Sequence, residues 1–369
     1  MLKVVFRADA SIKIGTGHVM RCLTLADELR RQGHECRFIC RAHPGHLGDL
    51  VTTKGHGLTL LTAPAAKEPD PRDSSSDNYA QWLGAPWQED ASQTLDAVKT
   101  LKPDWLVVDH YALDAEWERV LANAAGNIMV IDDLANRPHE CAVLVDQNFG
   151  REAADYDELL SAGCQRLIGP RYALLRPEFA QLREQSLKRR QHLELKRILV
   201  SLGGVDRTNV TGQVLEVLAK SSIPASTEMD IIMGSAAPHL NEVQQLAARL
   251  PFKATVSVDV KNMAERMMLA DLAIGAAGST SWERCCLGLP TLLMVLAENQ
   301  VAVAKALAAA GAAITIGDTA RVGTTLPSVL ESFRDTGRLK QMIAATTAIT
   351  DGNGVFSVVQ AMSTAERRD

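Results

Sequence analysis

Residues 7–41, RADASIKIGTGHVMRCLTLADELRRQGHECRFICR, decide the fold that the sequence predicts. The stretch joins an apolar run to an amphipathic segment at 18–32, and a second apolar run follows at 36–41. Strand, helix and strand in this order form the βαβ unit of a parallel sheet. The turn Gly15-Thr16-Gly17 makes room for a ligand at a helix N-terminus, where phosphate groups bind well. His18, directly behind that turn, is either a polar cap of the helix or a group that takes part in chemistry.

The same alternation continues along the whole chain. Short runs rich in β-branched residues alternate with longer amphipathic segments, which is the pattern of parallel sheets covered by helices. The strands expected in the first half are 2–7, 36–41, 58–63, 104–109, 127–132 and 142–147. Those expected in the second half are 197–202, 229–234, 254–259, 272–277, 291–296 and 312–317. The sequence therefore predicts an α/β protein with two Rossmann-like, doubly wound parallel-sheet domains, residues 1–165 and 166–369.

Length and composition agree with two soluble domains. The 369 residues exceed one ordinary core, and 46% hydrophobic with 22% charged residues is typical of globular proteins. A net charge of −5 and 4% aromatic residues argue against a nucleic-acid partner. No apolar run approaches the roughly 20 residues of a membrane span, and MLKVVFRADA lacks the features of a signal peptide. Seven cysteines without a framework spacing fit reduced thiols, so a cytoplasmic protein without a membrane partner is expected. The sequence does not define the oligomeric state.

Two segments interrupt the pattern. Residues 64–90 are rich in Pro, Asp and Ser and also carry Tyr79, Trp82 and Trp87. Long loops in compact domains are usually functional or disordered, and two tryptophans in a polar loop favour a lid over a spacer. Residues 183–197, rich in Lys, Arg, Glu and Gln, are expected to form a solvated helix and the linker to the second domain.

The GTGH turn does not fit the common cofactor motifs. A dinucleotide fingerprint needs a third glycine where this chain has Met20, and an acid where the second strand ends in Cys40-Arg41. The chain has no Gly-Lys-Ser/Thr, so a P-loop is excluded as well. No cofactor is therefore expected, and the turn by itself leaves both readings of His18 open.

A second glycine-rich turn predicts a nucleotide site. It lies in GAAGSTSWERCCLGLP, residues 275–290, where free backbone N–H groups and hydroxyls begin a helix and offer a cradle for a diphosphate. Glu283 either complements the helix dipole or accepts the two hydroxyls of a ribose. The ligand edge of a parallel sheet is formed by the carboxyl ends of its strands, and these residues follow such ends. The expected contacts are Gly278, Ser279, Thr280, Glu283, Asn299 and Gln300.

Other polar clusters are less specific. Gly203-Gly204 ends the first strand of the second half and is either a ligand contact or a plain turn. Asp109-His110-Tyr111 and Asp132-Asp133 contain possible metal ligands in adjacent positions. Neighbouring side chains in a strand point to opposite faces, however, so adjacent residues do not converge on one ion. His34, Cys36, Cys40, His43 and His46 match no zinc spacing. We therefore expect no metal site.

Several of these motifs, taken in order, resemble one enzyme family. They are Arg7-x-Asp9 with IGTGHVMRCLTLADEL, then YAQWLGAPWQEDASQT, VVDHY, IDDLANRPH, GPRYALLRPEF, and GAAGSTSWERCCLGLP with ENQ. They resemble the UDP-sugar hydrolases of pseudaminic acid biosynthesis, which serves flagellin or surface glycan modification and whose substrate is UDP-2,4-diacetamido-2,4,6-trideoxy-β-L-altropyranose. The match runs from about residue 2 to about residue 310. An insert at 66–78 and a longer C-terminal tail depart from the family.

The resemblance implies a fold and a set of roles. The family has the GT-B-like fold of metal-independent glycosyltransferases, two domains facing across a cleft, and resembles the enzyme that adds N-acetylglucosamine to the peptidoglycan lipid intermediate. His18 falls on the catalytic base, Glu283 lies near the ribose of UDP, and Tyr172 and Arg176 border the cleft. Gly17, Tyr111, Gly203 and Gly204 complete the expected substrate contacts. The resemblance leaves open whether residues 350–369 return to the first domain, as the last helix often does in this fold.

The implied reaction is hydrolysis of the UDP-sugar with inversion, without metal or cofactor. Two alternatives remain at this stage. One is a GT-B-type glycosyltransferase that hands the sugar to an acceptor hydroxyl, and the other is a nucleotide-sugar-binding module without turnover. The glycine-rich turns at 203–204 and 278–280 and the residue Asn299 all end strands of the second half, so the nucleotide contacts are expected after residue 195.

Overall fold

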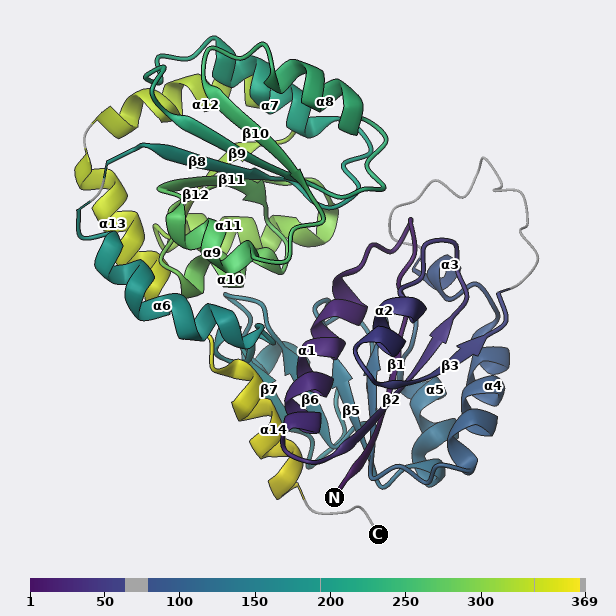
Figure 1. The fold of residues 1–369 in the computed structure, drawn as a ribbon. Helices are drawn as coiled ribbons and strands as arrows, with labels where there is room; N and C mark the ends of the chain where they lie inside the picture. Colours follow the sequence, from purple (N-terminus) through teal and green to yellow (C-terminus); the bar gives the residue numbers. More distant parts are fainter. Residues whose placement is uncertain (64–78, 193, 335, 366–369) are drawn as a thin grey trace. The chain divides into compact units, whose positions relative to one another are not determined.

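A computed structural model gives the fold of residues 1–63, 79–192, 194–334 and 336–365 (Figure 1). The insert at 66–78 therefore lies outside the described residues. The expected lid at 64–90 lies outside them up to residue 78, and the description resumes at Tyr79. The chain forms two compact units. The N-terminal unit consists of Met1–Leu174 and the chain from Asn353 on, and the C-terminal unit is Leu175–Gly352.

The N-terminal unit is built on a seven-stranded parallel sheet with the order β3-β2-β1-β4-β5-β6-β7. Its strands are β1 (Lys3–Ala8), β2 (Glu35–Arg41), β3 (Gly57–Leu61), β4 (Trp105–Asp109), β5 (Asn127–Ile131), β6 (Val143–Asp146) and β7 (Gln165–Ile168). Its helices are α1 (Gly17–Arg31), α2 (Gly48–Thr53), α3 (Ala80–Leu83), α4 (Trp87–Lys99), α5 (Ala115–Leu121) and α14 (Gly354–Thr364). Short 3-10 turns span Ala122–Ala124, Ala153–Tyr156 and Pro170–Tyr172.

The C-terminal unit is built on a six-stranded parallel sheet with the order β10-β9-β8-β11-β12-β13. Its strands are β8 (Arg197–Ser201), β9 (Glu228–Met233), β10 (Lys253–Val258), β11 (Leu272–Ala276), β12 (Thr291–Met294) and β13 (Ala313–Gly317). Its helices are α6 (Pro177–Arg189), α7 (Val210–Ala219), α8 (Leu240–Ala247), α9 (Met263–Leu269), α10 (Thr280–Cys286), α11 (Val301–Ala309), α12 (Val322–Glu331) and α13 (Thr336–Thr347). Short 3-10 turns span Glu298–Gln300 and Ser332–Arg334.

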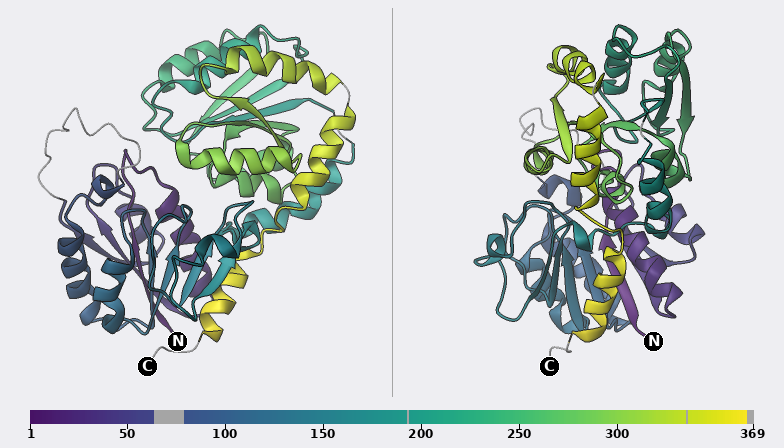
Figure 2. Two further views of the ribbon diagram at one scale, coloured as in Figure 1. Left: turned by 180° about the vertical axis from the view of Figure 1, so that it is seen from behind. Right: turned by 90° about the vertical axis from the view of Figure 1, so that its left-hand side faces the viewer.

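The predicted fold class is confirmed. All twelve expected strands form, and both sheets have the doubly wound order in which the first strand lies at the centre. Helices cover both faces of each sheet, as the views in Figure 2 show. One strand was not predicted: β7 has four residues of which only Leu167 is buried, which is too weak a pattern to read from sequence. Because β7 pairs with β6, the N-terminal unit extends to Leu174, beyond the expected boundary at residue 165.

Alternation along the central strand β1 builds the core of the N-terminal unit. Val4, Phe6 and Ala8 belong to the apolar cluster that includes the buried face of α1. Val5 belongs to the cluster on the opposite face of the sheet, with residues of α4 and α5. Arg7 follows Val5 on that second face and is fully buried, held by ion pairs with Asp9 and Asp90. The carboxyl end of β1 therefore carries a buried charged network into the turn before α1.

The last helix packs within the N-terminal unit. Helix α14 lies against α1, β6 and the 3-10 turn Pro170–Tyr172, and Val355 and Val358 join the core on the α1 face. Gly354 starts α14 so close to the chain that an added Cβ would lie 2.4 Å from the carbonyl oxygen of Ala173. The glycine is therefore a requirement of this packing. No helix among the described residues is long and apolar enough to cross a membrane.

We predict that Gly354→Ala destabilises the N-terminal unit. The new methyl group overlaps backbone atoms of Tyr172 and Ala173, and such overpacking costs about 1–3 kcal/mol. Gly323→Ala is the matched control, because Gly323 lies in α12 with open space around its Cβ position, and alanine there favours the helix by up to about 1 kcal/mol. Thermal melting should show a lower Tm for the first variant and an equal or higher Tm for the second. Equal melting of Gly354→Ala and the wild type would contradict the close packing of α14.

Candidate functional site

His18 pairs with a buried aspartate in the N-terminal unit. It is the second residue of α1, and the ring nitrogen Nδ1 lies 2.6 Å from Oδ1 of Asp109, the last residue of β4. The pair forms because β4 lies next to β1, with Ala8 opposite Asp109, and α1 follows β1 after one turn. A carboxylate accepts the hydrogen on Nδ1, which leaves the lone pair of the imidazole on Nε2. The ring is thus set up as a proton acceptor at Nε2, the orientation that an aspartate gives a catalytic histidine.

Arg21 keeps Asp109 ionised. Its guanidinium donates two hydrogen bonds to Asp109, Nε to Oδ2 at 2.6 Å and Nη2 to Oδ1 at 2.7 Å. Burial opposes ionisation of Asp109, but the charges of Arg21 and His18 and their hydrogen bonds outweigh it, so the pKa of Asp109 lies far below its usual range. A third bond of Arg21, from Nη1, reaches Oδ2 of Asp133 at 2.6 Å. Arg21, one turn after His18 on α1, was not singled out by sequence reasoning, although the spacing i, i+3 places the two on one face.

Aromatic rings surround His18. The ring of Tyr111 lies edge-on to the imidazole with centroids 4.6 Å apart, and that of Trp82 lies 6.3 Å away. Trp82 stacks on Tyr111 at 5.7 Å, and Tyr79 contacts both. The hydroxyl of Tyr111 donates to Asp133 at 2.9 Å, which joins the rings to the Arg21 network. Tyr79 and Trp82 belong to the expected lid; Trp82 lies beside His18, and Tyr79 packs on Trp82 and Tyr111.

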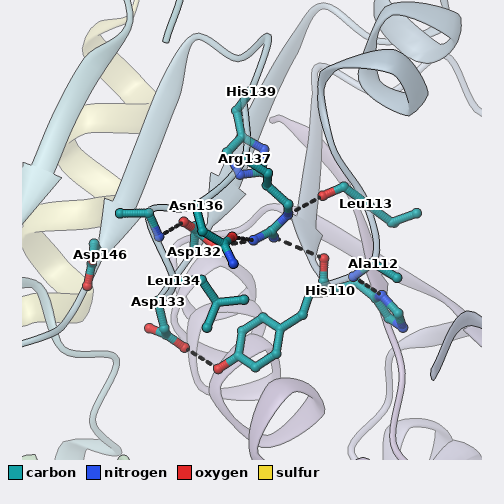
Figure 3. A network of polar contacts seen from close by, with 12 residues as sticks. His110, Ala112, Leu113, Asp132, Asp133, Leu134, Asn136, Arg137, His139 and Asp146 are labelled. Carbon is teal, nitrogen blue, oxygen red and sulfur yellow. Dashed lines mark hydrogen bonds and ion pairs between the residues drawn. The ribbon is translucent and has the colours of Figure 1, made fainter. Parts of the chain in front are cut away.

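Figure 3 shows the polar network around Arg137 and Asp132. Arg137 donates to the carbonyl oxygen of Leu113 at 2.8 Å, to Oδ1 of Asp132 at 2.8 Å and to the carbonyl oxygen of His110 at 3.4 Å. The network ties the segment after β4 to the segment after β5. Asp132 and its neighbour Asp133 serve different partners, Arg137 and Arg21, as expected for successive residues at a strand end. The described residues contain no group of three His, Cys, Asp or Glu side chains placed to hold a metal ion.

Glycine turns line one edge of the sheet in the C-terminal unit. Strands β8 and β11 pair with Ser201 opposite Gly275, so the turns that follow them lie side by side. A Cβ at Gly203 or Gly204 would meet no atom within 4 Å, and one at Gly278 would meet only Nε2 of Gln300, at 3.9 Å. Gln300 and Asn299 lie in the 3-10 turn that follows β12, the next strand. The structure thus brings the glycines expected to contact substrate and the Asn-Gln pair to one edge, with open space at the backbone.

Charged groups lie beneath this edge. The carboxyl of Glu283 on α10 is 3.8 Å from the guanidinium of Arg176, which also pairs with Glu178 at 3.0 Å. Burial raises the pKa of Glu283 to about 7, against the opposing charges of Arg176 and Arg284. Arg284 was missed in the sequence because it sits in an ordinary helical pattern. It is buried and donates to the carbonyl oxygen of Ala276 and to the hydroxyls of Thr280 and Ser281, so it holds the turn of Ser279 and Thr280 from within.

Tyr172 and Arg176, both expected to border the cleft, belong to different units. Tyr172 lies in the 3-10 turn Pro170–Tyr172 of the N-terminal unit, under the guanidinium of Arg171. Arg176 is the N-cap residue of α6 in the C-terminal unit. The motif GPRYALLRPEF crosses the division at Leu174, which sequence alone did not reveal. Gly17, by contrast, begins α1 beside His18 with open space at its Cβ position.

Comparisons with known proteins show what the chain is similar to. Residues 197–354 match the glycosyltransferase family 28 C-terminal domain. The chain is 26% identical over 310 residues to UDP-2,4-diacetamido-2,4,6-trideoxy-beta-L-altropyranose hydrolase of Campylobacter jejuni, covering 84% of this chain and 97% of that protein. The resemblance seen in the motifs is therefore confirmed along most of the chain.

Solved structures establish the fold. The Acinetobacter baumannii protein MurG superposes with a TM-score of 0.70 at 16% identity, covering 98% of this chain and 99% of that one. The spinosyn rhamnosyltransferase SpnG, in complex with thymidine diphosphate, superposes with a TM-score of 0.60 at 16% identity, covering 98% of this chain and all of that one. The fold is that of GT-B glycosyltransferases, as predicted.

Proposed function

We propose that this protein hydrolyses a UDP-linked 2,4-diacetamido-2,4,6-trideoxy sugar to UDP and the free sugar, with His18 as the catalytic base. The observation that carries the proposal is the pairing of His18 with an ionised, buried Asp109. The similarity to the Campylobacter jejuni hydrolase supports the choice of substrate, and the similarity to glycosyltransferase folds supports a nucleotide-sugar.

In the proposed reaction, Nε2 of His18 takes a proton from water while the water oxygen attacks the anomeric carbon. The bond between that carbon and the phosphate oxygen breaks, its electron pair leaves with UDP, and the configuration inverts. Asp109 holds the ring in the required tautomer and stabilises the imidazolium that forms. The proton then returns to solvent, which restores the neutral base.

We assign the nucleotide to the C-terminal unit. The backbone at Gly203, Gly204 and Gly278 leaves space for a ligand, and the hydroxyls of Ser279 and Thr280 lie at the same turn. Arg284 beneath this turn adds positive charge that favours a diphosphate and stabilises the negative charge of departing UDP. Glu283 would accept the ribose hydroxyls, and Asn299 and Gln300 would contact phosphate or sugar. On this assignment the groups that neutralise UDP are the protein's own, so turnover in EDTA is expected.

A glycosyltransferase remains the alternative, because the solved relatives include a rhamnosyltransferase on the same fold. Incubation of the UDP-sugar with enzyme and no acceptor separates the two reactions. A hydrolase consumes the UDP-sugar stoichiometrically and releases free sugar, whereas a transferase leaves it nearly untouched. UDP binding without any release of sugar would instead indicate a binding module.

The substitution His18→Asn tests the base. Asparagine keeps a polar side chain at the start of α1 but cannot take up the proton, so turnover should fall by roughly 10²–10⁴-fold, the contribution of a positioned base. UDP affinity should stay near that of the wild type, because the nucleotide is assigned to the other unit, whereas Tm should fall because buried Asp109 loses the hydrogen bond of the His18 ring. Turnover within a few-fold of the wild type would rule out the catalytic role of His18.

The substitution Asp109→Asn tests the orientation of that base. An amide in place of the carboxylate can donate to Nδ1 and so favours the wrong tautomer, and turnover should fall by about 10²-fold or more. Asp133→Asn is the matched control, since Asp133 also bonds Arg21 but has no contact with the His18 ring among those described. Both variants should melt at a lower Tm, and only Asp109→Asn should lose most of its turnover. An equal loss of turnover in the two would assign the effect to Arg21 instead.

The substitution Glu283→Gln should raise stability and weaken UDP binding, both in a pH-dependent way. The pKa of Glu283 rises from 4.5 to about 7 on folding, so the folded protein binds the extra proton and its stability falls as pH rises through that window. Glutamine lacks this ionisation, so its gain in Tm should be larger at pH 8 than at pH 5. At pH 8 the variant should bind UDP about tenfold more weakly than the wild type, because a hydrogen bond to a charged group is lost. At pH 5 Glu283 of the wild type is protonated, so the two proteins should bind UDP with similar affinity. Calorimetry at both pH values measures this, and a pH-independent difference would contradict the ionisation of Glu283.

A further inference from the structure

Three polar atoms face one another inside the N-terminal unit without a hydrogen bond. They are Oδ2 of Asp9, Nε2 of His43 and Nε2 of His110, and none has a partner within hydrogen-bond geometry among the described residues. Oδ2 of Asp9 lies 3.5 Å from the His110 nitrogen and 3.9 Å from the His43 nitrogen. Asp9 is fully buried and His110 is 3% exposed. Buried polar atoms are nearly always hydrogen-bonded, so this group requires an explanation.

The carboxylate of Asp9 is satisfied on one oxygen only. Its Oδ1 accepts a hydrogen bond from Nη1 of Arg7 at 2.7 Å and another from the backbone N–H of Arg41 at 2.6 Å. Burial opposes ionisation, yet the charge and hydrogen bond of Arg7 lower the pKa of Asp9 below its usual value. The second oxygen, Oδ2, is therefore a charged acceptor that needs a donor.

A hydrogen bond of His110 fixes which nitrogen of its ring carries a proton. The backbone N–H of Ala112 donates to Nδ1 of His110 at 3.1 Å, so the hydrogen of the neutral ring is on Nε2. Burial lowers the pKa of His110 to about 3, which keeps the ring neutral. Burial lowers the pKa of the His43 ring, and the neighbouring backbone of Trp82 opposes that shift. A neutral His43 ring that carries its hydrogen on Nδ1 presents a lone pair at Nε2.

We propose that one buried water binds at Asp9, His43 and His110, and that these three residues position the groups around His18. The water donates to Oδ2 of Asp9 and to Nε2 of His43, and it accepts the hydrogen from Nε2 of His110. Buried waters typically make about three such bonds, so one molecule satisfies all three atoms. At separations of 3.5 and 3.9 Å neither histidine nitrogen makes a direct hydrogen bond to Oδ2 of Asp9, and a water beside the three atoms, rather than between them, would contact all of them.

Each residue of this water site is attached to a different part of the His18 surroundings. In the sequence, His110 lies between Asp109 and Tyr111. Asp109 is the hydrogen-bond partner of His18, and the ring of Tyr111 contacts the ring of His18. The ring of His43 lies beside the backbone of Trp82, which influences its pKa. It also packs under Gly84, where a Cβ would lie 2.5 Å from its ring and where φ is +69°.

Asp9 belongs to the segment that follows β1. It follows the last residue of that strand and precedes the turn that leads to His18. A shift of the water site would therefore move an aspartate, a tyrosine and a tryptophan relative to one imidazole. Misplacement of a base by about 1 Å costs up to about 10²-fold in rate.

The test uses His43→Asn and His110→Asn, and its activity part rests on the proposed hydrolysis. Asparagine retains a short side chain able to bond Trp82 or Ala112, but it does not reach the water. We expect kcat to fall by about tenfold in each variant, with KM and UDP affinity nearly unchanged, because the side chains touch neither substrate nor nucleotide. The double variant should lose little more than either single variant, since both remove the same water.

His56→Asn is the matched control. His56 is a buried histidine of the same unit, and its ring contacts Asp27 rather than the water site. We expect a lower Tm with kcat within about twofold of the wild type. Wild-type kcat in His43→Asn or His110→Asn, or full additivity in the double variant, would overturn the positioning role.

A crystal structure of the wild-type protein tests the water without reference to activity. We expect one peak of density within about 2.7–3.2 Å of all three atoms. A direct bond from either histidine to Oδ2 of Asp9, with no water present, would overturn the site. If the wild type releases no sugar, the proposed function fails, while the density still decides the water site.

Discussion

The N-terminal unit depends on keeping one carboxylate charged inside the protein. Asp109 is fully buried, and a lone ionised group there would be strongly destabilising. Two hydrogen bonds from Arg21 and one from His18 compensate the lost hydration. Breaking such a buried pair by removing one partner typically costs about 3–5 kcal/mol, because the other charge stays behind. The orientation of His18 and the stability of this unit are therefore set by the same interaction.

The doubly wound order explains why these groups meet. In both sheets the first strand is central, and its neighbours on either side are the second and the fourth. The residues after β1 and β4 thus share one edge in the N-terminal unit, and those after β8 and β11 share one in the C-terminal unit. In the first case the edge holds an imidazole and a carboxylate. In the second it holds bare glycine backbone above a buried guanidinium. The same topology thus gathers the groups for the proposed proton transfer in one unit and those for the proposed binding of UDP in the other.

Sequence reasoning succeeded where a pattern is local and repeated. Runs such as KVVFRA and RILVS have both the composition and the flanking turns of buried parallel strands, so all twelve expected strands were found. It failed where the decisive fact is a neighbour in space. The contact between Asp109 and His18 depends on β4 lying beside β1, and the residues VVDHY alone do not predict that pairing. The short edge strand β7 and the division of GPRYALLRPEF between two units depend on tertiary packing.

The same limit applies to the buried polar residues. His43 appeared in the sequence only as part of a cluster that matches no zinc site, and Asp9 only as part of a family motif. Only the fold brings them together, because the segments at the ends of β1, β2 and β4 lie side by side and their side chains contact one another there. Arg284 is similar, because a helical arginine is usually solvated, and here it is buried against the carbonyl oxygen of Ala276.

In the proposed reaction, the choice between water and a larger acceptor depends on how the ring of His18 is enclosed. A histidine paired with an aspartate activates any hydroxyl that reaches Nε2, so the dyad alone does not distinguish hydrolysis from glycosyl transfer. His18 is only 8% exposed, with Tyr111 and Trp82 packed around its ring. An acceptor sugar must bring its whole ring to the base, whereas water needs space for a single oxygen. With His18 as the proposed base, its enclosure by Tyr111 and Trp82 would favour water over an acceptor sugar.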